Sequence, residues 1–209
     1  KVRLQGAKGN DLGQAQMRWA LASVGAGQLF EPVGFWINAP WKSIRKDLAE
    51  RLEYATLRVL FSVGEPGIAE NLLSRRMRHQ RCVWHGKRDF PYLLYADELK
   101  KADQQPFVDQ LHAIAAMSMT KAQLEKLRPQ DRLRVQQLAE QTQQGFENLL
   151  KALEPYPKAR DYIENLAKPV STFFTWWLEK GEALPLTTNA IESHFSQICN
   201  RVKRIGRRW

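Results

Sequence analysis

Cysteine and long apolar runs are both scarce in this chain. Its 209 residues include two cysteines, Cys82 and Cys199, which are too few for a disulfide scaffold and favour a reducing compartment. No apolar run approaches the roughly 20 residues that a membrane-spanning helix needs, and no signal peptide is visible. Internal repeats and low-complexity segments are also missing. We therefore expect a cytoplasmic globular protein without a membrane partner.

Positive charge, in contrast, is abundant. Lys and Arg number 32 against 22 Asp and Glu, which gives a net charge of +10 and a pI of about 9.8. This balance favours nucleic acid or another acidic partner, because neutralising phosphates releases counterions. Ribosomal and chaperone-like proteins share it, so charge alone indicates a kind of partner and not a function. With 44% hydrophobic residues, the chain can bury the core of one domain with or without a large insertion.

Strand patterns dominate the first part of the chain. Residues 1–5 alternate polar and apolar, and two apolar runs at 16–24 and 28–37 flank Gly25-Ala26-Gly27, which is a hairpin signal. Asn10-Asp11 reads as a loop. Pro40 is expected to open a helix, and a buried strand at 57–62, a helix at about 68–77 and a strand at 81–84 follow. This order predicts an α/β fold, with a mixed sheet flanked by helices.

The character of the sequence changes at about residue 87. Strand signals stop, and helices are expected at 106–119, 120–127, 130–153, 157–167 and 170–180, with prolines and Gly181 as breaks. Thr120 and Gln123 have the spacing of a capping box. We therefore divide the chain into a sheet core (1–86), a helical insertion (87–181) and a final helix that returns to the core (182–209). Because residue 1 already reads as strand, we expect a portion of a longer protein with a truncated N-terminus.

One carboxylate stands out near the C-terminus. Glu192 lies in the first turn of a helix that follows Thr188-Asn189, a helix-start pattern. Two-metal phosphoryl transfer needs such a carboxylate together with others from distant strand ends. After the strand at 57–62, however, Val63 cannot bind a hard cation, and Glu65 lies in a turn, where glutamate is usually solvated. The alternative for Glu192 is a surface residue that complements the helix dipole.

Cys82 and His85 are a second pair of candidate site residues. They are three residues apart and could provide half of a zinc site, with His194 and Cys199 as the other half. The loose spacing of that second pair, without a Cys-x-x-Cys motif, favours packing and hydrogen bonding without a metal.

Three segments of the sequence together resemble a known family. They are SVGEPGI after a strand, RCVWHGKRDF, and LTTNAIESHFSQICNRVKRIGRR, with YPKAR in the helical stretch between. In these motifs the chain is similar to the catalytic domain of Mutator-like transposases and the related bacterial insertion-sequence transposases, over nearly its whole length. The resemblance implies an RNase H-like fold, with an all-helical insertion before the last catalytic helix. It also implies an Asp-Asp-Glu triad that binds two Mg²⁺ (or Mn²⁺) ions.

The resemblance carries over to named residues. It makes Glu192 the third catalytic acid and a metal ligand. Cys82 and His85 match the Cys-x-x-His signature beside the active site, and Thr188 and Asn189 match the residues that introduce the Glu helix.

Two catalytic acids do not match. The second acid falls on Val63, and the first falls just upstream of residue 1; Asp11 is a poor substitute because it reads as loop. The family activity is metal-dependent phosphodiester cleavage and strand transfer. With one of three carboxylates present, we expect this chain to lack that activity.

The implied partner is double-stranded DNA, at transposon ends and target, bound by a homo-oligomer in a bacterial, nucleoid-associated setting. The basic residues expected to contact phosphates are Arg81, Lys87, Arg88, Arg201, Lys203, Arg204, Arg207 and Arg208. Ordinary solvated charge is the alternative for all of them. Trp84 could stack on an unpaired base, although a core position is the more common role for tryptophan.

Three other functions stay open. A transposase-derived DNA-binding protein without catalysis is favoured by Val63. A nuclease or recombinase on the same fold would hydrolyse without strand transfer, a distinction that these residues do not encode. A zinc-stabilised structural module would be recognised by its metal content.

Overall fold

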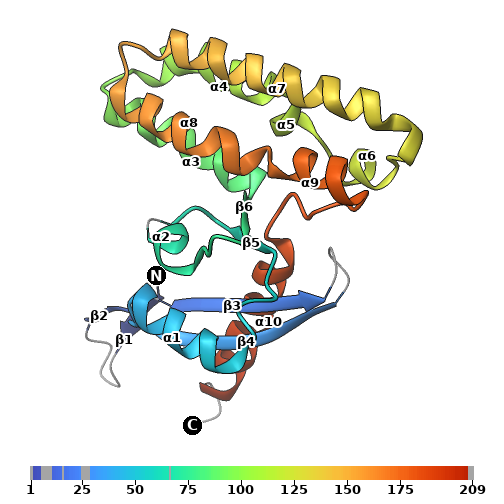
Figure 1. Cartoon of the computed structure of the whole chain (residues 1–209). Coiled ribbons are helices and arrows are strands. Elements are labelled where there is room, and N and C mark those ends of the chain that lie inside the picture. Colours follow the sequence, from blue (N-terminus) through green and yellow to red (C-terminus); the bar gives the residue numbers. More distant parts are fainter. Residues whose placement is uncertain (1, 6–10, 16, 25–28, 66, 207–209) are drawn as a thin grey trace. The chain divides into compact units, whose positions relative to one another are not determined.

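The computed structural model describes residues 2–5, 11–15, 17–24, 29–65 and 67–206; for residues 2–5, 11–15, 17, 24, 29, 198–199 and 202–206 it describes the backbone only (Figure 1). Two compact units emerge, and each is described by itself. The hairpin unit comprises Lys1–Leu57, Pro66–Arg76 and Asn189–Trp209, and the helical unit comprises Arg58–Glu65 and Met77–Thr188. Helices and strands are both present, which confirms the α/β class.

The hairpin unit contains two antiparallel strand pairs. β1 (Val2–Gln5) pairs with β2 (Asp11–Ala15), and β3 (Met17–Val24) pairs with β4 (Leu29–Ile37). In the longer pair the register shifts between Ala20 and Leu21, opposite Pro32 and Gly34. Proline has no amide hydrogen to donate to a ladder, so a bulge is where a strand tolerates it. The antiparallel pairing of β3 with β4 confirms the predicted hairpin.

Three helices complete the hairpin unit. α1 (Trp41–Arg51) begins after Pro40 and buries Ile44 and Leu48, which lie one turn apart on one face. Trp36 of β4 donates its indole N–H to the Asp47 carboxylate at 2.8 Å and so attaches α1 to the hairpin. α2 (Ile68–Leu72) is short, and α10 (Asn189–Gly206) carries Glu192 in its first turn.

The helical unit contains one parallel strand pair. β5 (Val59–Ser62) pairs with β6 (Arg78–Arg81), with Ser62 opposite Arg81. β6 is polar, and several of its groups form hydrogen bonds to the helices, although Gln80 Oε1 and Arg81 Nε have no partner. Gln80 is fully buried and donates to the Val170 carbonyl at 3.2 Å, and Thr172 donates to the His79 carbonyl at 2.7 Å.

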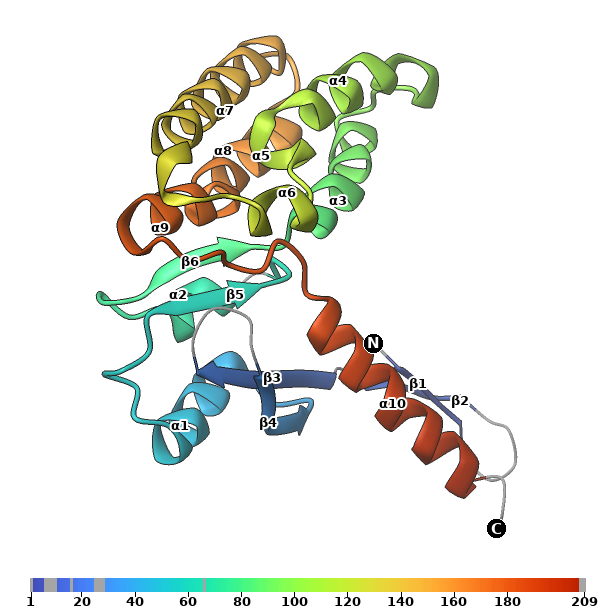
Figure 2. The same cartoon turned by 90° about the vertical axis from the view of Figure 1, so that its right-hand side faces the viewer.

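Seven helices and one 3₁₀ turn make up the rest of the helical unit (Figure 2). They are α3 (Val83–Ala96), α4 (Lys101–Ala113), α5 (Ala115–Ser118), α6 (Lys121–Glu125), η1 (Pro129–Asp131), α7 (Arg132–Ala152), α8 (Pro157–Val170) and α9 (Thr172–Lys180). Phe90, Leu111, Leu149, Ile163 and Phe173 are fully buried between them. These side chains come from five different helices, so one continuous core holds the helical unit together.

Most helices lie close to where the sequence predicts them. The capping box at Thr120 and Gln123 is present, and Gly181 ends α9 with a φ of 69°. Pro106, however, lies inside α4 and not at its start, and α8 continues one residue past Pro169 to Val170. α3 runs through residues 86 and 87, where we expected the insertion to begin.

Several strand predictions are corrected. The described strands form three two-stranded sheets and not the single mixed sheet that we expected. Asp11 begins β2 and is not in a loop, and the helix expected at 68–77 ends at Leu72. The strand expected at 81–84 is β6, which ends at Arg81; Val83, 6% exposed, starts α3. Polar residues form β6 because they pair with β5 and hydrogen-bond to α8 and α9, a long-range effect that local hydrophobicity does not report.

Candidate functional site

Val63, where the resemblance implies the second acid, lies in the turn after β5. Val63 directly follows Ser62, the last residue of β5, and is half-buried. Gly64 has a φ of 90°, a conformation that favours glycine. A Cβ at this position would lie 2.1 Å from an Nη atom of Arg81, so the glycine backbone lies directly against that guanidinium. The expected placement of Val63 at a strand end is confirmed.

Arg81 is an internal residue, contrary to our expectation of a DNA contact. Its side chain is 6% exposed, its guanidinium lies 5.2 Å from the ring centroid of Tyr162, and its Nε has no hydrogen-bond partner. Burial raises the pKa of Tyr162, and the charge of Arg81 opposes this rise. We therefore replace the predicted phosphate contact with packing against Tyr162 and Gly64, which fixes the turn after β5.

A polar pair lies beside this arginine. Ser62 Oγ and His79 Nε2 are 2.8 Å apart. Burial, reinforced by the positive charge of Arg81, lowers the pKa of His79 to about 4. His79 is therefore neutral at pH 7, and the strand end carries one positive charge and not two.

Cys82, His85 and Thr188 form a buried polar cluster. Thr188 Oγ1 lies 3.5 Å from Cys82 Sγ and 3.4 Å from His85 Nδ1. All three side chains are less than a tenth exposed. Burial raises the pKa of the Cys82 thiol, but hydrogen bonds from His85 and Thr188 outweigh it and bring the pKa down to about 7. A hydroxyl that donates to the sulfur can accept from the imidazole N–H, which satisfies all three groups.

This cluster joins three segments that are far apart in the sequence. The Cys82 amide donates to the Ser62 carbonyl at 2.9 Å, which attaches the start of α3 to the end of β5. The Val83 amide donates to the Leu186 carbonyl at 2.9 Å, two residues before Thr188. The strand end with Val63, the Cys-x-x-His segment and the approach to α10 therefore meet within the helical unit.

The other acids of the predicted site belong to α10 and to the turn after β5. Glu192 and Asn189 belong to α10 of the hairpin unit, where both side chains are exposed. Glu65 is half-buried in the turn after β5. Within the described residues, no three His, Cys, Asp or Glu side chains gather closely enough to hold a metal ion. Val63 offers no ligand atom, so the residues present do not fit the two-metal site that the resemblance implies.

The predicted basic contacts differ in exposure. Arg88 is exposed, stacks over Trp84 at 5.0 Å and pairs with Asp89 at 2.7 Å. Burial lowers the pKa of Lys87, which is half-buried. Arg201 is exposed on α10. The side chains of Lys203 and Arg204, and all of Arg207 and Arg208, lie outside what the structure describes.

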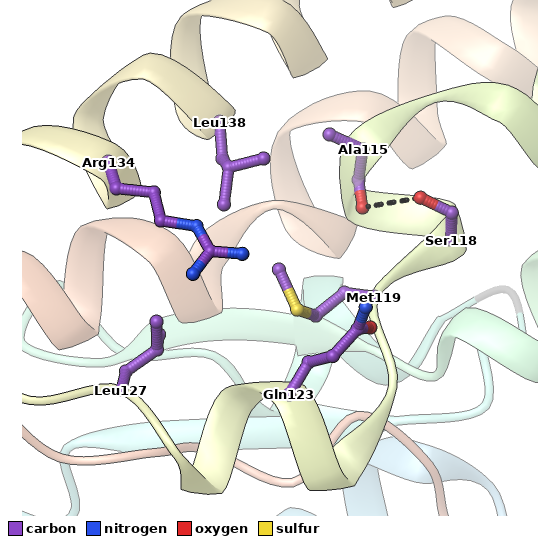
Figure 3. Close-up of a pocket in the computed structure, with 7 residues that line it drawn as sticks. All are labelled: Ala115, Ser118, Met119, Gln123, Leu127, Arg134 and Leu138. Carbon is purple, nitrogen blue, oxygen red and sulfur yellow. Dashed lines mark hydrogen bonds between the residues drawn. The ribbon is translucent and has the colours of Figure 1, made fainter. Parts of the chain in front are cut away.

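A small pocket of about 100 Å³ opens between α5, α6 and α7 (Figure 3). Met119, Leu127 and Leu138 give it an apolar lining, and Arg134 and Gln123 add polar groups. Ligand pockets are typically several times larger, about 300–1,000 Å³, so this hollow is a packing gap and not a substrate site.

Sequence reasoning missed Tyr162, Ser62 and His79 as neighbours of the strand end. Ser62 and His79 could have been found by aligning the two strands in parallel, because both then face the same side. No sequence pattern indicated that Tyr162 contacts Arg81, because Tyr162 belongs to a helix about 80 residues further along the chain.

Comparison of the chain with models of protein families, with curated proteins and with solved structures gave no match. Among the helices that the structure describes, none is both long enough and apolar enough to cross a membrane.

Proposed function

We propose that this chain is the RNase H-like domain of a DNA transposase in which metal-dependent catalysis has been lost, and that it binds double-stranded DNA. The observation that supports this most directly is the meeting of the β5 end, Cys82-x-x-His85 and Thr188, which are three of the segments behind the resemblance to Mutator-like transposases.

The proposed loss of catalysis follows from the ligand chemistry. In an intact relative, two Mg²⁺ ions would activate water or a 3′-hydroxyl for attack on a phosphodiester. Here Val63 stands at the strand end where a carboxylate ligand is required, and Arg81 lies buried beside it. We derive no catalytic step for this chain, because its residues do not fit the metals.

DNA binding rests on the charge of the chain and on exposed cations. The net charge is +10, and Arg88 and Arg201 are exposed. Such residues position a duplex through its phosphates without reading its sequence. A homo-oligomer bound at transposon ends is part of the proposal.

Fluorescence anisotropy with duplex DNA over a range of salt concentrations tests the proposal. We expect binding that weakens as salt rises, and a salt slope reduced by about one for Arg201→Gln. Arg160→Gln is the matched control, since Arg160 is exposed but paired with Glu164 at 3.2 Å. Absence of duplex binding at low salt would contradict DNA binding, and Mn²⁺-dependent nicking by the unmodified chain would contradict the loss of catalysis.

A transposase-derived DNA-binding protein that never acts in transposition is the second candidate. Val63 favours it, since a protein that only binds DNA has no use for the missing acid. Both candidates predict duplex binding, and they differ in whether the chain assembles on paired transposon ends.

A further inference from the structure

Helix α3 presents an uncovered face that is rich in aromatic side chains. Trp84, Tyr92 and Tyr95 are 51%, 70% and 72% exposed. At about 100° per residue, they and Arg88 fall within an arc of roughly 80° around the helix axis. Figure 2 shows α3 at the edge of the helical array. We call these four residues the aromatic face.

A cation is already stacked on this face. The Arg88 guanidinium lies 5.0 Å from the centroid of the Trp84 ring, and the salt bridge of 2.7 Å to Asp89 helps to hold it there. A stacked arginine presents both a flat surface and hydrogen-bond donors, the combination that binds a base together with its phosphate.

We propose that the aromatic face binds single-stranded nucleic acid by stacking unpaired bases on Trp84, Tyr92 and Tyr95. From Trp84 to Tyr95 the helix rises by about 16 Å, the length of roughly five nucleotides at about 3.4 Å each. Base–aromatic stacking is tolerant of sequence and works together with a positive surface. The net charge of +10 provides the attraction for a polyanion.

The composition of the face favours single strands over other occupants. The bases of a duplex hide their flat surfaces in the stack, so duplex binding uses cations and not exposed rings. The large hydrophobic side chains that α3 exposes are all aromatic, and each ring offers a flat surface on which a base can stack. The inference rests on α3 alone and does not require the transposase origin proposed above.

The test uses the whole chain and a fluorescein-labelled dT oligomer long enough to span α3, with a duplex of the same length as the second probe. Tyr92→Ala/Tyr95→Ala should weaken oligo(dT) binding about tenfold or more, because two stacking platforms are lost. Trp84→Ala should weaken it similarly, and Trp84→Phe should restore most of the affinity. Duplex binding should change less than about twofold, since the cations are kept.

Leu133→Ala is the matched control, because Leu133 is 68% exposed on α7, away from this face. It should leave both probes unaffected. Oligo(dT) binding that survives the double tyrosine change would overturn the proposal, as would equal losses for single strand and duplex. Variants that change self-association in sedimentation but not oligo(dT) binding would identify the face as a contact between copies of the chain instead. A reduced salt slope of duplex binding for Arg201→Gln, with oligo(dT) binding kept, would separate this proposal from the proposed function.

Discussion

The two units of the molecule differ in the core that their described residues form. In the helical unit Phe90, Leu94 and Phe173 are among many large side chains with no exposed surface, whereas among the described residues of the hairpin unit Ile44 alone is fully buried, and Phe35 and Ile37 are 38% and 58% exposed. The Cys82–His85–Thr188 cluster and the strand end with Val63 belong to the densely packed unit. Glu192 belongs to the other. The helical unit therefore holds its part of the proposed site against a continuous core.

The largest effect should come from truncating the core of the helical unit. Phe90→Ala removes a fully buried ring that stacks on Tyr162 with centroids 6.5 Å apart, and should lower the free energy of unfolding by about 3–5 kcal/mol. Phe35→Ala, in the hairpin unit, should cost less than about 1.5 kcal/mol, because its ring is already partly solvated. Urea unfolding measures both. Equal costs would remove the contrast between the units.

A second change tests the contact between Gly64 and Arg81. Gly64→Ala should cost about 1–2 kcal/mol for its positive φ and about 1–3 kcal/mol more for the clash with the guanidinium. Gly181→Ala is the control, because Gly181 also has a positive φ but nothing lies within 4 Å of the added Cβ. The two variants are compared by thermal unfolding. If both lose the same stability, Arg81 does not hold the turn after β5.

A smaller effect is expected at Thr188. Thr188→Val keeps the shape but removes the hydroxyl between Cys82 and His85, and should cost about 1–2 kcal/mol. Without that hydrogen bond the pKa of Cys82 should rise above about 7, which ultraviolet titration of the thiolate detects. Thr188→Ser should retain the low pKa. A low pKa in Thr188→Val would show that the hydroxyl has no part in the cluster.

The smallest effect concerns pH and His79. Its folded-state pKa, about 4, lies below the ordinary 6.5, so the unfolded chain binds more protons between these values. The contribution of His79 to stability is therefore complete above about pH 6.5 and is lost as the pH falls towards 4. His79→Gln should flatten this part of the stability profile. His112→Gln, which changes an exposed histidine, should alter the slope of stability against pH less than His79→Gln does. A larger effect of His112→Gln would contradict the burial of His79.

The sequence predicted local structure better than long-range structure. The β3–β4 hairpin, β5, the capping box at Thr120 and the stop at Gly181 all follow from short patterns, and all are present. β6 was placed three residues too late, because the apolar residues after it look more like a strand than its own polar ones. The hydrogen-bond partners of the polar residues in β6 lie far away in the sequence. Val170, whose carbonyl accepts from Gln80, is about 90 residues further along the chain.

The candidate site could be predicted only in part. The motifs around Val63, Cys82 and Thr188 were visible in the sequence, and the structure brings these segments together. The phosphate contact predicted for Arg81 was wrong, because a sequence does not distinguish a buried arginine from an exposed one. Its burial depends on Gly64 and Tyr162, which approach it from a turn and from a distant helix.

The central proposal is that Val63 occupies the position of a metal-binding acid that, in the family the chain resembles, acts with the acid matched by Glu192. Titration with Mn²⁺, followed by electron paramagnetic resonance, tests it most directly. The account predicts that Val63→Asp binds Mn²⁺ at least about tenfold more tightly than Leu73→Asp, which adds the same charge at an exposed position. It also predicts that Glu192→Gln abolishes this gain. Equal affinity of the two Asp variants, or a gain that persists without the Glu192 carboxylate, would contradict the account.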